Sequence, residues 1–342
     1  MAGEMNPRER WGLLLIDEFP DRPPVYPLVT SHASAVYGCD LISYCSDGKI
    51  LAEAQLAAQR KYGHEGLSVF TDVGLIAEAM GSKYHLREFE VPILNRPIIE
   101  ELSAIDKLKL PDPGGSGRLP VYLEAIEKLY QAKGDVLPVF AFVPAPFTTA
   151  AGLRGIEDFL VDTITEPEAA HRILELSLEA AIKFCDECIL CGALPMLVDP
   201  LASGSVISRR TFAEFALPYN RKLITHLHRY DLDVTLHICG ETSSIVDLIS
   251  DTGADLFSLD KLDIDIARSS IGDKVRLVGN LAPHNLMASS GVSIEDNCHH
   301  IIDSGIRNKK GFVISTGCEV PIRCQPEKLQ KYIKLGKEAR YE

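Results

Sequence analysis

Short apolar runs rich in β-branched residues alternate with longer amphipathic stretches along the 342 residues of this chain. Short runs bounded by turn residues predict buried strands, and the longer segments between them predict helices. We identify eight candidate strands: Val25–Leu28, Ser68–Thr71, Pro138–Phe142, Pro195–Asp199, Asp233–His237, Leu256–Leu259, Val275–Gly279 and Phe312–Ser315. Eight strands alternating with helices are what a (β/α)8 TIM barrel requires. The alternation therefore predicts an α/β fold, a single barrel domain over residues 1–342.

Helical segments lie between these runs, and several begin at Ser, Thr or Asp or end at Gly. They are Glu166–Leu190, Ser208–His228, Ser243–Thr252, Ile264–Ile271, Ile294–Ser304 and a C-terminal helix that starts near Pro326. A doubly wound sheet is the competing α/β architecture, but no Gly-x-Gly-x-x-Gly follows the first strand. The barrel is therefore favoured.

Two stretches of the chain are additional to the strands and helices that a simple barrel needs. The residues before Val25 form an N-terminal extension, and Thr71–Pro138 is longer than a helical crossover needs. The second stretch contains several prolines and the run Gly114-Gly115-Ser116-Gly117, which is typical of a flexible loop. We expect this long early excursion to lie over the barrel mouth and to influence substrate specificity.

Composition and charge narrow the class of protein. With 46% hydrophobic and 24% charged residues the chain can bury a large core. A net charge of −13 argues against nucleic acid or an anionic membrane as partner, because clustered Lys and Arg hold those surfaces. The chain has no signal-like segment and no apolar run of about 20 residues, so we expect a cytoplasmic protein. Nine cysteines without secretory features predict reduced thiols rather than a disulfide framework.

Three potential metal ligands follow two of the predicted strands. His237 ends the fifth run, Cys239 begins its loop, and Cys318 follows the eighth run. Active residues of such barrels gather at the carboxyl ends of the strands, and residues i and i+2 of a strand point the same way. One imidazole and two thiolates would leave an open position on Zn²⁺, which is typical of a catalytic site. The alternative is that these are pocket-wall residues and an unrelated buried thiol.

Other polar residues are weaker candidates. Asp199 ends the fourth run and is either a proton relay, a hydrogen-bond acceptor or fourth ligand at the metal site, or a carboxylate that caps its loop. Asn280 follows the seventh run and is a candidate substrate contact or a stabiliser of the strand-end turn. The three-residue spacing of Cys185, Cys188 and Cys191 resembles part of an iron–sulfur signature, but the segment reads as helix and lacks the fourth Cys, which favours packing.

Several segments together resemble the uroporphyrinogen decarboxylase superfamily, within it the zinc-dependent cobamide methyltransferases typified by methylcobamide:coenzyme M methyltransferases. The segments are Leu236–Gly240, Arg276–Asn280 and Ser315–Cys318, supported by Asp199–Ser203 and Asp21–Val25. The family's zinc pattern, His-x-Cys followed far downstream by Cys, corresponds to His237, Cys239 and Cys318. The resemblance implies a methyltransferase in which Zn²⁺ binds a small thiol such as coenzyme M and the methyl group comes from a corrinoid. Glu319 departs from the small residue expected beside the third ligand.

The resemblance also implies a partner and leaves alternatives open. No Asp-x-His-x-x-Gly run supplies a lower cobalt ligand, so the cobamide is expected to arrive on a separate corrinoid protein. Related enzymes instead use zinc as a Lewis acid on a methyl ether and pass its methyl group to cobalt. A uroporphyrinogen-type decarboxylase is a weaker alternative, because residues Tyr26–Ser34 contain no Arg or Lys where the decarboxylases carry an Arg-rich segment. A non-catalytic zinc-binding or corrinoid-binding protein is the third alternative.

Overall fold

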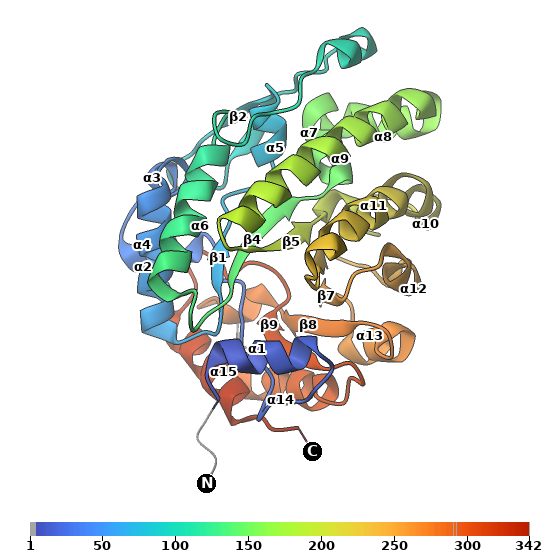
Figure 1. Ribbon diagram of the computed structural model, residues 1–342. Helices are drawn as coiled ribbons and strands as arrows, with labels where there is room; N and C mark the ends of the chain where they lie inside the picture. The colour runs from blue at the N-terminus through green and yellow to red at the C-terminus, as the bar shows by residue number, and fades with distance from the viewer. Residues whose placement is uncertain (1–4, 290, 292, 342) are drawn as a thin grey trace.

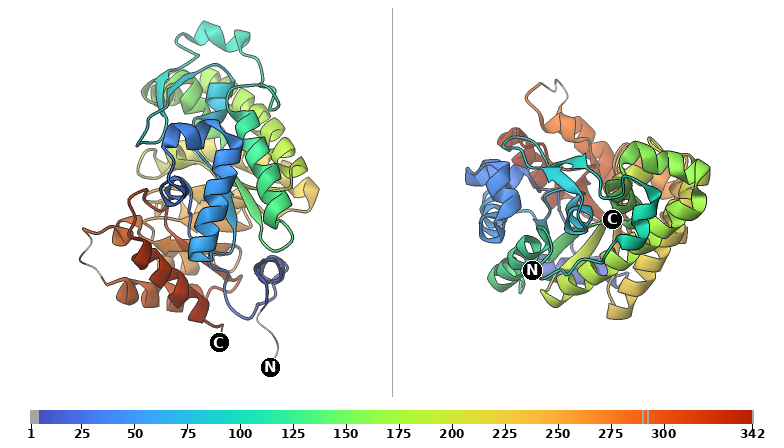
Figure 2. Two further views of the ribbon diagram at one scale, coloured as in Figure 1. Left: turned by 90° about the vertical axis from the view of Figure 1, so that its left-hand side faces the viewer. Right: turned by 90° about the horizontal axis from the view of Figure 1, so that it is seen from above.

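A computed structural model describes residues 5–289, 291 and 293–341 (Figure 1). Seven parallel strands pair in one sheet, in the order β1 (Leu67–Val69), β4 (Val139–Pro144), β5 (Leu194–Val198), β6 (Thr235–Ile238), β7 (Leu256–Leu259), β8 (Arg276–Leu281) and β9 (Phe312–Thr316). These strands agree with seven of the eight predicted runs to within about two residues, and their curved sheet with helices outside confirms the α/β barrel (Figure 2).

The remaining predicted strand, Val25–Leu28, is wrong as a strand, because only its first residue pairs, in an isolated parallel bridge with Ile314 of β9. Pro24 and Pro27 lack amide hydrogens, so a ladder cannot continue through this segment. The segment still lies between the two edges of the sheet. On its other side, the amide of Glu65, just before β1, donates a hydrogen bond to the Val25 carbonyl (2.9 Å). The barrel is thus closed by a proline-rich connection.

Helices cover the outside of the sheet. After β4 and β5 they are α7 (Pro146–Arg154), α8 (Ile156–Thr165), α9 (Pro167–Leu190), η2 (Pro200–Ala202), α10 (Arg209–Thr211), η3 (Phe212–Ala216), α11 (Leu217–Leu227) and η4 (His228–Tyr230). After β6 to β9 they are α12 (Val246–Ile249), η5 (Ser250–Thr252), α13 (Ile264–Ile271), η6 (Pro283–Leu286), α14 (Ile294–Gly305) and α15 (Pro326–Glu338). The predicted helices from residue 166 onward are all present, although the one over 243–252 begins three residues late.

The long excursion between β1 and β4 contains α5 (Leu75–Ala79), an antiparallel hairpin, the short helix η1 (Leu102–Lys107) and then α6 (Leu119–Lys133). The hairpin strands, β2 (Lys83–His85) and β3 (Ile93–Arg96), were not predicted, because they are short, mostly exposed and without a regular apolar pattern. The Ser82 hydroxyl donates to the Gly152 carbonyl of α7 (3.0 Å). Because α7 follows the carboxyl end of β4, the excursion lies at that end of the barrel, at the top of Figure 1.

The N-terminal extension is helical and closes the opposite end. It contains α1 (Pro7–Leu15), while α2 (His32–Tyr37), α3 (Leu41–Ser46) and α4 (Gly48–Tyr62) precede β1. Trp11 and Leu14 of α1 belong to the apolar cluster that fills the barrel interior, and the Trp11 indole donates to the Glu65 carbonyl (2.8 Å). A second, larger cluster packs the helices against the outside of the sheet. Only the carboxyl end of the barrel is therefore free of this helical plug.

Among the described residues, no helix combines the length and the apolarity that crossing a lipid bilayer requires. The single-domain boundary at residues 1–342 stays a prediction.

Candidate metal centre

His237 points into the barrel because of the register of β6. It lies opposite Val198 of β5, and Thr235 lies opposite Met196. Val198 and Met196 both belong to the apolar cluster in the barrel interior. Side chains alternate along a strand, so His237 faces inward while Leu236 and Ile238 pack under the helices. The imidazole is 4% exposed and sits at the top of the interior core.

The two cysteines reach the same point from loops. Cys239 directly follows β6, and the next residue, Gly240, has φ +76°, a left-handed conformation that favours glycine. A Cβ at Gly240 would meet the Ser205 hydroxyl at 2.8 Å. The Gly240 amide donates to Asp260 Oδ2 (2.8 Å), which fixes the turn. Cys318 lies two residues after the end of β9.

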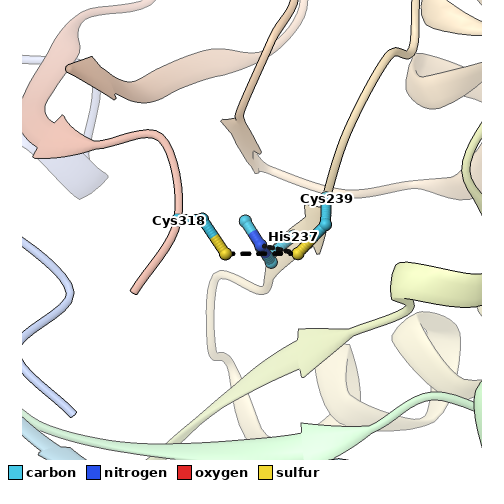
Figure 3. A group of neighbouring side chains, drawn as sticks. All are labelled: His237, Cys239 and Cys318. Atoms are coloured by element: carbon cyan, nitrogen blue, oxygen red, sulfur yellow. Dashed lines mark hydrogen bonds between the residues drawn. The ribbon is translucent and has the colours of Figure 1, made fainter. Parts of the chain in front are cut away.

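The three side chains converge on one point (Figure 3). His237 Nε2 lies 2.9 Å from Cys239 Sγ, and the two sulfurs are 3.4 Å apart. All three ligand atoms lie within 4.8 Å of one another. In the described part of the chain, this is the one group of three or more His, Cys, Asp or Glu side chains whose ligand atoms lie so close together. Both cysteines are half-buried, and a small cavity of about 50 Å³ opens beside them.

These residues share their protons. The hydrogen bond between the cysteines lowers the pKa of Cys318 and raises the pKa of Cys239. The lowered pKa favours the thiolate form of Cys318 within the pair. A thiolate at neutral pH is both a nucleophile and a metal ligand.

The donor set fits Zn²⁺. In a tetrahedral zinc site with Zn–S about 2.3 Å and Zn–N about 2.0 Å, neighbouring ligands lie about 3.8 Å (S to S) and about 3.5 Å (S to N) apart. The distances of 3.4 Å and 2.9 Å between the side chains here are shorter by about half an ångström. A zinc ion would need only this small separation of the three groups, and the cavity side would remain open.

Ser258 orients the imidazole, a contact that we did not predict. Its hydroxyl lies 2.9 Å from His237 Nδ1, which leaves Nε2 for the cysteine side. The signal was present in the sequence, because Ser258 is the one polar residue of the run Leu256–Leu259 and pairs in register with His237. Groups that hold a metal-binding His through its other nitrogen set its orientation and basicity.

Replacing Ser258 with alanine is expected to weaken zinc binding by about 10- to 100-fold, because the His237 ring loses the partner of its Nδ1. Competition titration against a zinc chelator measures this change. Ser315→Ala is the matched control, since the buried Ser315 hydroxyl has no hydrogen-bond partner among the described residues. Equal zinc affinities in Ser258→Ala and wild type would exclude the positioning role.

Asp199 lies close in sequence to the cavity wall but points elsewhere. Its fully buried carboxylate accepts hydrogen bonds from the amide (2.9 Å) and hydroxyl (2.7 Å) of Thr148 on α7 and from Asn220 Nδ2 on α11 (2.9 Å). Burial raises the pKa of Asp199 to about 6, although the hydrogen bonds oppose this. The carboxylate thus ties two helices to the end of β5, and its catalytic role stays a prediction.

Asn280 also faces away from the cysteines. Its Nδ2 donates to the carbonyls of Asp260 (3.0 Å) and Leu262 (2.7 Å), which holds the loop after β7. It lines a separate cavity of about 440 Å³ between that loop and α14, together with His284 and His300. The structure therefore brings three of the five predicted residues together, and a substrate contact of Asn280 stays a prediction.

Glu319 reaches the centre itself. It is half-buried and lines the small cavity, and its Oε2 accepts hydrogen bonds from the hydroxyls of Thr30 and Ser31 (3.4 Å for the latter). Burial and the neighbouring Cys318 raise the pKa of Glu319 to about 7.

The cysteines of α9 lie away from this centre. Cys185 and Cys188 are fully buried in the outer core, where they pack among apolar side chains.

Comparison with known proteins agrees with this architecture. Residues 7–339 match the uroporphyrinogen decarboxylase (URO-D) family. The chain is 29% identical to a methylated-thiol–coenzyme M methyltransferase of Methanosarcina mazei, over 99% of this chain and 91% of that protein. It is 27% identical to a uroporphyrinogen decarboxylase of Shewanella baltica, over 86% of this chain and 84% of that one.

A solved structure of a methyltransferase from Methanosarcina mazei has the same fold, with a TM-score of 0.89, 22% identity and coverage of 98% of this chain and 99% of that one. Sequence and fold agree along nearly the whole chain. The chain therefore belongs to the uroporphyrinogen decarboxylase family.

Proposed function

We propose that this protein is a zinc-dependent methyltransferase that moves a methyl group between a corrinoid carried by a partner protein and a small thiol. The observation that carries the proposal is the convergence of His237, Cys239 and Cys318 at the open end of the barrel, beside a small cavity. Similarity to a methylated-thiol–coenzyme M methyltransferase supports the reaction class. Residues 1–342 would act as one domain in the cytoplasm.

In this proposal each group of the chain has a defined task. Bound Zn²⁺ would supply a positive charge that keeps a coordinated substrate thiol deprotonated at neutral pH. His237, Cys239 and Cys318 would hold it, and Ser258 would orient the imidazole. The apolar floor of the cavity, with Phe142 and Val198, would keep water from the sulfur.

The chemistry balances without a further reactant. A thiol loses its S–H bond and gains an S–CH₃ bond while the Co–C bond of the methylcobamide breaks. The thiol proton passes to solvent, and the electron pair of the Co–C bond stays with cobalt. With two cysteine thiolates on the metal, the substrate sulfur would stay electron-rich, which favours this direction over Lewis-acid chemistry on a methyl ether.

The decarboxylase alternative is disfavoured by charge. An octacarboxylate substrate needs basic side chains, and no Arg or Lys is among the described residues that line the cavity beside the cysteines. Family membership alone does not choose between the activities, because unrelated chemistry recurs on one fold.

The proposal is tested by metal content and by the absorbance of methylcobalamin with small thiols. We expect about one zinc per chain, loss of demethylation after treatment with a chelator, and recovery on adding Zn²⁺. Demethylation that is unchanged after complete zinc removal would contradict the proposal. Zinc without any thiol-dependent reaction, but with methylation of Co(I) cobalamin by methyl ethers, would assign the opposite direction.

A further inference from the structure

The cavity beside the cysteines limits what can bind there. Its volume of about 50 Å³ is on the order of one or two water molecules, so a substrate must be small where it meets the sulfurs. Apolar side chains form most of its wall, among them Leu28, Phe70, Phe142 and Val198. The rings of Phe70 and Phe142 lie 5.3 Å apart, centroid to centroid. Glu319 is the one carboxylate that the wall contains among the described residues.

Glu319 is held with one oxygen available. Its Oε2 is engaged by Thr30 and Ser31, from the segment that closes the barrel. Its Oε1 has no hydrogen bond within the described part of the chain, and it is not enclosed as a buried unpartnered atom. Because Glu319 directly follows Cys318, this acceptor is fixed one residue away from a sulfur of the centre.

An ionised Glu319 would give the cavity a net negative charge even with metal bound. Zn²⁺ and two thiolates sum to zero, which leaves the Glu319 carboxylate. Asp260, whose Oδ2 holds the Gly240 amide, adds a second acidic group nearby.

Two basic side chains near this end, Arg118 and Lys261, do not line the cavity beside the cysteines. Arg118, behind the loop after β1, pairs with Asp72 (2.7 Å) and Glu78 (2.6 Å). Lys261 lines the separate cavity beside Asn280. An anionic group on the substrate would therefore meet an ionised Glu319 at short range, which disfavours its binding.

We propose that the site selects small thiols whose other end is an amine, and that Glu319 Oε1 accepts a hydrogen bond from that ammonium group. The aromatic faces of Phe70 and Phe142 would favour the same cation. The inference rests on the proposed function, because it identifies the substrate class of the same site. It departs from the sulfonated thiol coenzyme M, the acceptor implied by the sequence resemblance.

Three thiols that share a two-carbon chain test this proposal: 2-aminoethanethiol, 2-mercaptoethanol and 2-mercaptoethanesulfonate. The zinc-loaded full-length protein is assayed with each for methylcobalamin demethylation, and their dissociation constants are measured by calorimetry. We expect the amine to exceed the sulfonate by about 30-fold or more in kcat/KM and in affinity, with the neutral thiol between them. Values relative to 2-mercaptoethanol within one preparation cancel any misfolded fraction.

Variants of Glu319 separate the effect of its charge from the effect of its shape on substrate preference. Glu319→Gln should reduce the preference for the amine over the sulfonate by about tenfold, and Glu319→Asp should keep most of it. Glu157→Gln is the matched control, because Glu157 is an exposed carboxylate of α8 that does not line the cavity, and it should leave the preference unchanged.

The outcomes distinguish the two proposals. Activity with 2-mercaptoethanol, together with an equal or higher preference for the sulfonate or an unchanged preference in Glu319→Gln, would overturn the selection by Glu319 while leaving methyl transfer intact. Binding that follows the amine preference without any turnover would support the selection and contradict the proposed reaction. Neither binding nor turnover with any thiol would overturn both.

Discussion

Alanine in place of Cys318 is expected to abolish both zinc retention and methyl transfer. Cys318 supplies one of the three ligand atoms, so its loss would leave two ligands for the metal. Changes that only disturb the orientation of ligands already cost about 10- to 100-fold, so the loss of a ligand should exceed 100-fold in methyl transfer. Metal analysis of the purified variant and the methylcobalamin assay measure the two effects together. Cys239→Ala should behave in the same way.

The matched control is Cys191→Ala. Cys191 is also a half-buried free cysteine, but it lies at the end of α9, away from the centre. We expect this variant to keep one zinc per chain and wild-type activity. A Cys318→Ala protein that keeps stoichiometric zinc and full activity would refute the assignment of Cys318 as a ligand. Loss of zinc in both Cys318→Ala and Cys191→Ala would instead indicate that zinc retention does not depend on this centre specifically.

Glutamine in place of Glu65 is expected to destabilise the fold by about 3–5 kcal/mol without removing the metal centre. The Glu65 carboxylate is 3% exposed and joins two buried guanidinium groups, Arg10 (2.7 Å) and Arg22 (2.8 Å), and it also accepts the Val25 amide (2.9 Å). Removing its charge leaves buried positive charge with less compensation, which is costly in a low-dielectric interior.

Urea unfolding measures this loss, and the exposed ion pair of Arg87 and Glu90 provides the control. Glu90→Gln should change the free energy of unfolding by less than about 1 kcal/mol, because solvent screens such pairs. If Glu65→Gln unfolded within about 1 kcal/mol of wild type, the buried network would not stabilise the amino end of the barrel. Since that end lies opposite the cysteines, the folded variant should still bind zinc.

The barrel and its three sulfur and nitrogen ligands could be predicted because their signals are local. Seven strands followed from short apolar runs, and α13 (Ile264–Ile271) was predicted at its observed bounds. The spacing of His237 and Cys239 predicted a shared direction because side chains alternate along a strand. Cys318 could be added because the carboxyl ends of parallel strands meet at one face. Its ligand role, like that of the other two, is a proposal.

Features that depend on contacts between distant segments could not be predicted in the same way. Strand periodicity suggested a strand at Val25–Leu28, but its prolines and the edges of the sheet reduce it to a bridge. The excursion hairpin has no apolar alternation, so its position rests on Ser82 and Tyr84 packing against α7. The segment Asp21–Val25 carried part of the family resemblance, and only the fold explains it, through the ion network around Glu65.

The sequence by itself thus determined which residue types reach the carboxyl end of the barrel. Only the tertiary structure decided which way they point. Asp199 directly follows β5 and Asn280 lies near the end of β8, yet their side chains bind α7, α11 and the loop after β7. Glu319 departed from the expected pattern, and it faces the cavity because Thr30 and Ser31, almost 290 residues earlier, hold its other oxygen. The physical reason is that periodicity fixes a side chain's face, whereas its hydrogen-bond partners come from segments that only folding brings together.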